Sequence, residues 1–466
     1  MTEKRKRKLA MPDTLIIVAS VVLLVAILSW IIPSGTYDYQ EMNINGRIRN
    51  VAIDGTYHTI DKSEVTTTGF LGFFSVLYRG CVEAADVIFM ILCCCGTFGV
   101  VVKTGAFHAG IGTILKKLKG KEILLVPIIM LIFGLGGSVF GMASEFYGFY
   151  PLIVGLGVAL GYDAMFGFAI IAVGEFVGFM GATLNPYSVG IAQTISGVEL
   201  YSGTGYRTIC FVIFMVISII YVMMYGRKIK KNPGASVVFG EKNIHAFDRD
   251  ELNEYSFTLK DGLVLLDVLV VLVVLMFGLI KWGWDFPQLC GLFLLMSMIA
   301  AAICKWSPNK WCSEFIDSAK TAMWGCILTG IAKAITVVMQ DAQIMDTVIY
   351  GLSNVLKNAP HAVSAQVMLV VQTLINFFIP SATGQASATM PIMAQLADII
   401  GVSRQTAVLA FQFGDGLSNI FWPTADIVII CGLGGISLQK WYKWFTPLFL
   451  ILFATQAILL GIATGI

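Results

Sequence analysis

The chain has 466 residues, of which 57% are hydrophobic and 13% are charged, and its formal net charge is +2. A mean hydropathy of +0.80 and recurring apolar runs of about 20 residues, each long enough to cross a hydrocarbon core of ~30 Å, predict a polytopic helical membrane protein. The small net charge gives no reason to expect a nucleic-acid partner.

The N-terminal part, residues 1–68, predicts one span followed by a polar loop. Five basic residues stand between Met1 and Lys8, and the apolar run from Pro12 to Ile32 follows without a cleavage pattern. Basic flanks stay in the cytoplasm, so we expect a multi-pass protein of the plasma membrane with a cytoplasmic N-terminus. Turn signals and alternating polarity over residues 33–68 favour a short external β-hairpin.

Residues 69–225 form the next predicted unit. Apolar segments on either side of Gly141 to Glu145 predict a helical hairpin over residues 123–160 that dips in from the cytoplasm; two complete crossings are the alternative. A broken helix over residues 164–195 follows. It is interrupted at Thr183 to Pro186, because proline lacks a backbone donor and disfavours helix at the preceding residue.

The polar stretch 226–260 predicts a cytoplasmic linker, and residues 261–310 predict two connecting transmembrane helices. Residues 311–466 then repeat the earlier order. An apolar hairpin covers residues 363–400 with Ser381 to Gln385 at its tip, and a second broken helix covers residues 406–438, interrupted at Gly414 to Thr424.

A shift of 240 positions aligns the two units without a gap. It places the following pairs together: Ser381 on Gly141, Gln385 on Glu145, Pro391 on Pro151, Gly401 on Gly161, Gly414 on Gly174 and Asp415 on Glu175. Shared composition of two glycine-rich segments is the alternative explanation. Because the first unit begins outside and the second in the cytoplasm, we predict an all-α fold of two inverted repeats, each with a re-entrant hairpin and a broken transmembrane helix.

Two hairpin tips and two helix breaks predict a polar site near the middle of the membrane, since non-helical backbone is tolerated there only where it is buried or lines a cavity. Unwound carbonyls, hydroxyls and amides suit Na⁺, and half-helix N-termini suit an anionic group. We therefore predict a site for a small polar solute with Na⁺ or H⁺ as coupling ion and no other cofactor. The substrate candidates are Ser144, Glu145, Asn185, Ser381, Thr383, Gln385, Asp415 and Asn419; the Na⁺ candidates are Ser138, Thr183, Asn185, Ser418, Asn419 and Thr424.

Acidic residues at membrane depth are candidates for function, because an ionised group is costly there. Glu145 has the neutral partner Gln385, which favours a substrate or proton role. Glu175 and Asp415 share one repeat position, so capping of a broken helix is an alternative for both. Lys333 is either a counter-ion or a snorkelling side chain. An acid-lined pocket without a deep arginine favours a cationic or zwitterionic solute over a dicarboxylate.

Two other classes of function fit less well. An intramembrane enzyme needs a nucleophile with a base, or paired metal ligands, at depth, and the four histidines fall in loops or at span ends. An ion channel suits a continuous pore rather than hairpins that enter from opposite faces. We therefore expect no enzymatic activity.

Four runs carry a resemblance to a known family: Gly141–Glu145, Gly181–Ile191, Phe378–Gln385 and Phe411–Asn419. They resemble the YfcC-like branch of the C4-dicarboxylate anaerobic carrier (DcuC-type) family, within the ion transporter superfamily, over nearly the whole chain. The resemblance implies a secondary transporter of elevator type, often a homodimer, in the lipid bilayer.

The resemblance leaves the substrate open. The family label implies C4-dicarboxylates moved with Na⁺ or H⁺, whereas this branch also resembles arginine/ornithine exchangers; the charge argument favours the second. The breaks resemble the Ser-Asn-Thr elements that hold Na⁺ in related symporters. Here Thr424 lies several residues beyond Ser418 and Asn419, so the pattern is incomplete.

Overall fold

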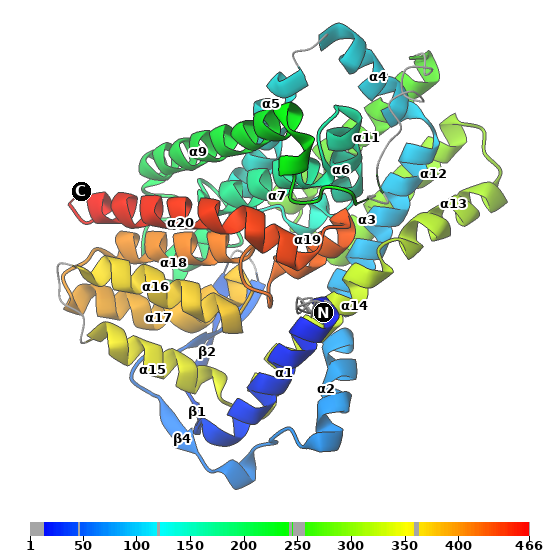
Figure 1. Cartoon of the computed structure of the whole chain (residues 1–466). Coiled ribbons are helices and arrows are strands. Elements are labelled where there is room, and N and C mark those ends of the chain that lie inside the picture. The colour runs from blue at the N-terminus through cyan, green and yellow to red at the C-terminus, as the bar shows by residue number, and fades with distance from the viewer. Residues whose placement is uncertain are drawn as a thin grey trace, which may run out of the picture.

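The computed structural model describes residues 14–44, 47–118, 122–241, 245, 257–357 and 363–465 (Figure 1). The basic N-terminal stretch and residues 242–244 and 246–256 of the predicted linker lie outside the described residues. In the described part, seven helices are long and apolar enough to cross a membrane, and they confirm the predicted polytopic helical fold: α1 (Thr14–Ile31), α3 (Ala85–Lys103), α9 (Thr204–Lys231), α11 (Leu259–Lys281), α12 (Phe286–Ile303), α14 (Met323–Asp341) and α20 (Leu438–Ala463).

The polar loop after α1 forms two small antiparallel sheets, whereas the rest of the described regular structure is helical. β1 (Ser34–Thr36) pairs with β4 (His58–Ile60), and β2 (Tyr39–Ile44) pairs with β3 (Arg47–Ala52) as the predicted hairpin. The loop is attached next to α15 (Met345–Lys357). Asp346 of that helix accepts hydrogen bonds from the Tyr37 backbone nitrogen at 3.0 Å and from the Tyr39 hydroxyl at 2.8 Å.

Three further helices lie beside the long ones: α2 (Phe70–Glu83), α4 (Ala106–Leu118) and α13 (Pro308–Lys320). The first of these helices follows the β-strand loop. It packs closely on α14, because a Cβ atom at Gly80 would lie 2.3 Å from the Gly330 carbonyl oxygen. Helices α2 and α14 therefore form one tightly packed pair.

Each predicted helical hairpin consists of two short helices. The first hairpin contains α5 (Leu125–Leu135), the π-helical turn η3 (Gly136–Phe140), the single turn η4 (Ser144–Phe146) and α6 (Phe149–Ala159). The second contains α16 (Ser364–Phe378) and α17 (Ala382–Ile399), with Ser381 as the N-cap of α17.

Each hairpin is followed by a broken helix: α7 (Ala164–Met180) and α8 (Val189–Ile195), then α18 (Arg404–Ser418) and α19 (Asp426–Gly434). We call residues 181–188 the first break and residues 419–425 the second break. The prediction that the second interruption begins at Gly414 was wrong by about one turn. The helix continues to Ser418 because it packs against α16 there; a Cβ atom at Gly414 would lie 2.9 Å from Gln372 Cβ.

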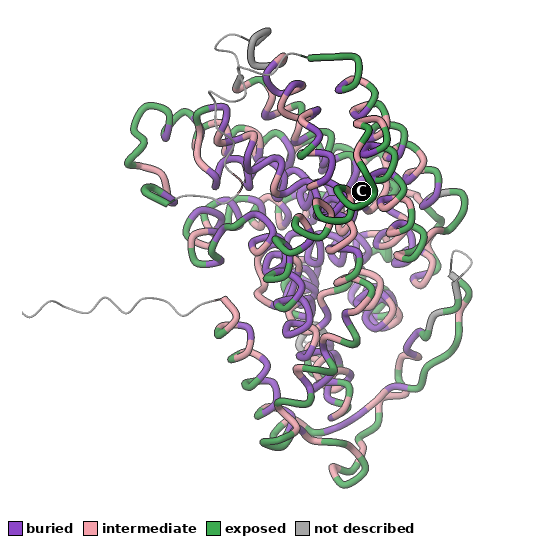
Figure 2. Tube along the Cα trace, turned by 90° about the vertical axis from the view of Figure 1, so that its right-hand side faces the viewer, coloured by how far each residue is buried: buried purple, intermediate pink, exposed green. Residues whose placement is uncertain are grey.

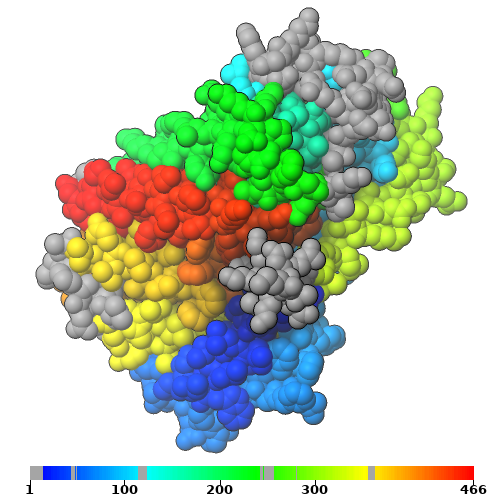
Figure 3. All heavy atoms as spheres, in the orientation of Figure 1, coloured from blue at the N-terminus to red at the C-terminus, as the bar shows by residue number. Residues whose placement is uncertain are grey.

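Buried backbone is concentrated in the interior of the helical part (Figure 2), and helices α7 and α18 belong to this buried core. All of α7 is buried, and so is α18 from Thr406 to its end. The two helices pack against each other, and the Gln412 side chain of α18 donates to the Phe179 carbonyl of α7 at 2.7 Å. The inverted relation of the two units stays a prediction. Helices α9, α20 and α16 cover this core as neighbouring bands in the space-filling view (Figure 3).

The first hairpin packs on α7 through backbone contact. A Cβ atom at Gly178 would lie 2.0 Å from the Gly134 carbonyl oxygen, so no side chain fits. We expect Gly178→Ala to lower the free energy of unfolding by about 1–3 kcal/mol or more, as overpacked cores do. Gly205→Ala is the matched control, since its Cβ atom would meet nothing within 4 Å. Thermal unfolding in detergent checks both, and equal melting temperatures would contradict the packing argument.

Candidate functional site

A cavity of about 520 Å³, which we call the central cavity, lies where both hairpin tips approach α14. Ser144 and Tyr147 come from the first hairpin, Ser381 and Gly384 from the second hairpin, and Thr424 from the second break. The opposite wall comes from α2 and α14. The site therefore lies between the hairpin tips and the α2–α14 pair.

Three charged side chains line the central cavity among the described residues: Glu83, Lys333 and Asp426. Asp426 is the first residue of α19, where the partial positive charge of a helix N-terminus stabilises an acid. Its Oδ1 atom accepts a hydrogen bond from the Tyr147 hydroxyl at 2.7 Å, which joins the start of α19 to the first hairpin. The cavity thus offers one positive and two negative charges.

The wall formed by α14 is a polar stripe on an otherwise apolar helix. Thr329, Lys333, Thr336 and Gln340 follow one another at intervals of four, three and four residues, which places them on one helical face. Of the three charged residues, Lys333 alone was a candidate from the sequence. The signal that could have found this wall is the helical period of the stripe.

The first break is held together by its own hydrogen bonds. Ser138 Oγ donates to the Gly181 carbonyl at 3.0 Å and lies 3.2 Å from Thr183 Oγ1. Asn185 Oδ1 accepts from the backbone nitrogens of Tyr187 and Ser188 at 2.9 and 3.1 Å. These predicted Na⁺ candidates are brought together, but their contacts are those of a structural turn.

Arg207 also reaches the first break. It is only 2% exposed, and its Nη2 atom donates to the Thr183 carbonyl at 3.1 Å. The sequence argument was that the acid-lined pocket has no deep arginine. The charge argument still holds for the central cavity, because Arg207 does not line it. Its guanidinium repels a cation from the Thr183 carbonyl, so the first break is a poor Na⁺ site.

The second break has a different arrangement. Asn376 of α16 donates from Nδ2 to Asp415 Oδ1 at 2.8 Å and to Asn419 Oδ1 at 3.1 Å. The remaining oxygens, Asp415 Oδ2 and Asn376 Oδ1, are buried and accept no hydrogen bond from any residue that the structure describes. Buried oxygens normally have partners, so these two oxygens are candidate ligands for a proton or a cation. Ser418 lies beside it and donates to the Gly414 carbonyl at 2.6 Å.

The other predicted residues fall into two groups. Ser144, Ser381 and Thr424 line the central cavity. Glu145 lies just behind Ser144, is 8% exposed, and accepts from the Ala143 backbone nitrogen at 3.0 Å. Gln385 is fully buried and donates to the Gln372 carbonyl at 2.9 Å, which joins the two arms of its hairpin.

Glu175, which the shift of 240 positions pairs with Asp415, is also fully buried. Its Oε2 atom accepts a hydrogen bond from the Tyr150 hydroxyl of α6 at 2.8 Å. Each of the two acidic residues is therefore joined to the hairpin that precedes it in the chain, Glu175 through Tyr150 and Asp415 through Asn376. Only the second position has several amide and carboxylate oxygens close together.

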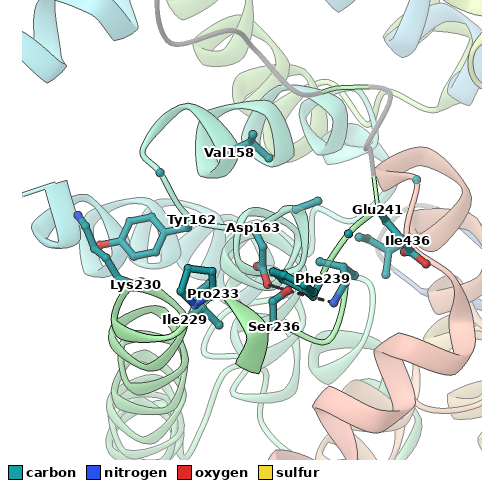
Figure 4. A pocket seen from close by; sticks show the side chains of 15 residues that line it. Val158, Tyr162, Asp163, Ile229, Lys230, Pro233, Ser236, Phe239, Glu241 and Ile436 are labelled. Atoms are coloured by element: carbon teal, nitrogen blue, oxygen red, sulfur yellow. Dashed lines mark hydrogen bonds between the residues drawn. The ribbon is translucent and has the colours of Figure 1, made fainter.

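A further cavity of about 480 Å³ lies at the end of α9, between the start of α7 and the segment after η5 (Pro233–Ala235) (Figure 4). Asp163 points into it, accepts from the hydroxyls of Tyr225 and Ser236 at 2.5 and 2.6 Å, and caps α7 through the Phe166 nitrogen at 2.7 Å. These bonds account for Asp163 as a structural residue.

Comparison with known proteins assigns the family. The model of the C4-dicarboxylate anaerobic carrier family, DcuC, matches residues 11–465. This chain belongs to the DcuC family. The DcuC chain is 32% identical to an Escherichia coli K12 protein named "Putative basic amino acid antiporter YfcC", over 98% of this chain and 96% of the relative. It is also 27% identical to an uncharacterised Haemophilus influenzae protein, over 99% of both chains.

Two solved transporters also align with the DcuC chain at 16% sequence identity. The Alcanivorax borkumensis YdaH transporter aligns with a TM-score of 0.43, over 97% of this chain and 98% of its own. Neisseria gonorrhoeae MtrF, described as an antimetabolite efflux pump, aligns with a TM-score of 0.44, over 98% and 96%. The family assignment rests on the sequence matches, and it makes this chain a multi-pass membrane transporter.

Proposed function

We propose that this DcuC-family chain is a secondary active transporter that exchanges basic amino acids of the arginine/ornithine type. The observation that carries the proposal is the charge set of the central cavity, one cation and two acids. Arginine and ornithine have the complementary set, one carboxylate and two cationic groups. Lys333 would bind the carboxylate, while Asp426 and Glu83 would bind the two cationic groups.

The name of the Escherichia coli relative supports the same substrate class. A C4-dicarboxylate carries two negative charges, and the central cavity offers it one lysine against two acids. Carriage of dicarboxylates, coupled to Na⁺ or H⁺, is the second candidate, because the family description names it and Lys333 supplies one counter-charge.

The packing of the molecule supports an elevator mechanism. The hairpins and broken helices form one body through contacts such as Gly178 with Gly134, and α2 with α14 forms another through Gly80 and Gly330. The central cavity lies between them. Movement of the first body along the second would carry the solute across the membrane with its site intact. A homodimer and a cytoplasmic N-terminus stay predictions.

The coupling ion belongs at the second break in this proposal. The unpartnered oxygens of Asp415 and Asn376, with Asn419 beside them, suit H⁺ or Na⁺, whereas Arg207 disfavours a cation at the first break. The cluster is linked to the central cavity through Thr424, which lines the cavity and donates to the carbonyl of Phe377, the residue after Asn376, at 2.7 Å. Occupation of the cluster would fix the second break and so prepare the cavity for the solute.

Exchange in proteoliposomes tests the substrate. We expect internal ornithine to drive uptake of labelled arginine, and we expect arginine to raise the melting temperature of the purified protein, since a ligand that binds only the native state stabilises it. Asp426→Asn should remove most of that stabilisation, whereas Asp317→Asn, an exposed residue of α13 paired with Lys320, should not. Stabilisation and counterflow by succinate in place of arginine would favour the second candidate.

A further inference from the structure

An outer cavity of about 500 Å³ lies between the β2–β3 hairpin and α17, and no residue of α14 lines it. Tyr39, Ile48 and Asn50 form its strand wall. The strand register explains why these residues share one face: Tyr39 pairs with Ala52, which is two positions from Asn50, and Ile48 is two positions from Asn50 on the other side. The β-hairpin therefore presents one side to the second helical hairpin.

The two cavities meet at the tip of the second hairpin. Ser381 and Gly384 line both the central cavity and the outer cavity. One turn of α17, capped by Ser381 Oγ on the Gly384 nitrogen at 3.3 Å, thus separates the two spaces. A solute that occupies the outer cavity is one helical turn away from the central cavity.

The hydroxyls of the outer cavity are held as hydrogen-bond acceptors. Thr383 Oγ1 donates its hydrogen to the Tyr187 carbonyl at 2.9 Å, and Ser387 Oγ donates to the Thr383 carbonyl at 2.8 Å. Each hydroxyl oxygen then offers only lone pairs to the cavity. Glu41 pairs with Asn50 in the register, so it leaves the ribbon on the same face. This lining suits a solute rich in hydrogen-bond donors, such as an ammonium or guanidinium group.

We propose that the outer cavity is a second binding subsite, in which a cationic small solute is held by Thr383, Ser387 and Asn50 before the tip of the second hairpin admits it to the central cavity. The proposal rests on the proposed function for the choice of solute. The loop that carries the β-hairpin is attached to the end of α14, where the Ser34 hydroxyl donates to the Ala342 carbonyl at 2.7 Å and the Gly35 nitrogen donates to the Gln343 carbonyl at 2.9 Å. The wall that carries Asn50 would therefore stay with α14 while the hairpin tip moves. The protein would then begin to select its solute in the outer cavity, before the solute reaches the central cavity.

Cysteine labelling tests the subsite with purified full-length protein in detergent. Asn50→Cys places a thiol in the outer cavity, and Gln40→Cys places one at an exposed position on the other face of the same ribbon. We expect arginine to slow modification of Asn50→Cys by a maleimide on the order of tenfold, with modification of Gln40→Cys unchanged. The modified peptide is quantified by mass spectrometry, so the ten native cysteines do not interfere.

The same measurement with Lys333→Ala separates the two cavities. Protection of Asn50→Cys that persists in this background places the solute in the outer cavity, and protection that disappears places it in the central cavity alone and overturns the subsite. Absence of protection in the unaltered background also overturns it. Arginine exchange by the wild-type protein then shows whether the proposed function fails as well, because intact exchange without protection leaves only the subsite wrong.

Discussion

Replacing Lys333 by methionine should abolish exchange of arginine. Among the described residues that line the central cavity, Lys333 is the one with a positive charge. A neutral side chain in its place would leave the substrate carboxylate without a counter-charge. Truncating one partner of a buried charge pair costs about 2–5 kcal/mol, which corresponds to a loss of at least about 30-fold in apparent affinity. Uptake by proteoliposomes and the arginine-dependent shift in melting temperature both measure it.

Two further variants make the Lys333 result specific. Lys333→Arg keeps the charge and should retain part of the exchange activity. Lys320→Met removes an exposed lysine of the neighbouring α13, which is paired with Asp317, and should exchange arginine like the wild type. Unchanged affinity in Lys333→Met would mean that this lysine only extends its amine to the membrane surface, and the charge match with basic amino acids would be lost.

Asp415→Asn should uncouple transport from the driving ion while leaving solute binding intact. Asp415 is fully buried and does not line the central cavity, so the amide should not touch the solute. The Asp415→Asn substitution removes the charge that would attract a cation to Asn376 and Asn419. We expect the dependence of transport on pH or Na⁺ to disappear and the rate to fall at least about tenfold, ~1.4 kcal/mol in the barrier, with the dissociation constant for arginine unchanged.

Glu175→Gln is the matched control for Asp415→Asn, because it makes the same change at the corresponding position of the other repeat. The glutamine can still accept the hydrogen bond from Tyr150. We expect the ion dependence of transport to survive in this variant. Loss of ion dependence in Glu175→Gln, with Asp415→Asn unaffected, would show that our proposal places the coupling ion in the wrong repeat.

Much of the fold could be predicted because its signals are local. Pro186 and the polar run after Pro380 mark interruptions wherever the chain folds, and alternation marks the β2–β3 hairpin. The end of α18 was misplaced because Gly414 indicates a break in sequence, whereas in the structure it allows close contact with Gln372. Local composition does not distinguish these two uses of glycine.

The candidate site was harder to predict because its charges come from distant segments. Glu83, Lys333 and Asp426 meet only after α2, α14 and α19 have packed, and no single stretch contains two of them. Several residues chosen from the tips and breaks, such as Asn185 and Gln385, satisfy backbone groups that the interrupted helices leave open. Polar residues at a break can bond to these backbone groups or bind a ligand, and the sequence alone does not distinguish the two roles.

Arg207 has a consequence for the stoichiometry of transport. Its guanidinium gives the first break a permanent positive charge that travels with the protein, whereas the second break can take a positive charge from solution and release it. Two related halves would then carry one exchangeable ion per cycle in place of two. Neutralising Arg207 would remove the positive charge from the first break as well as loosen the turn. A second ion could then bind there, so the charge moved per solute should change.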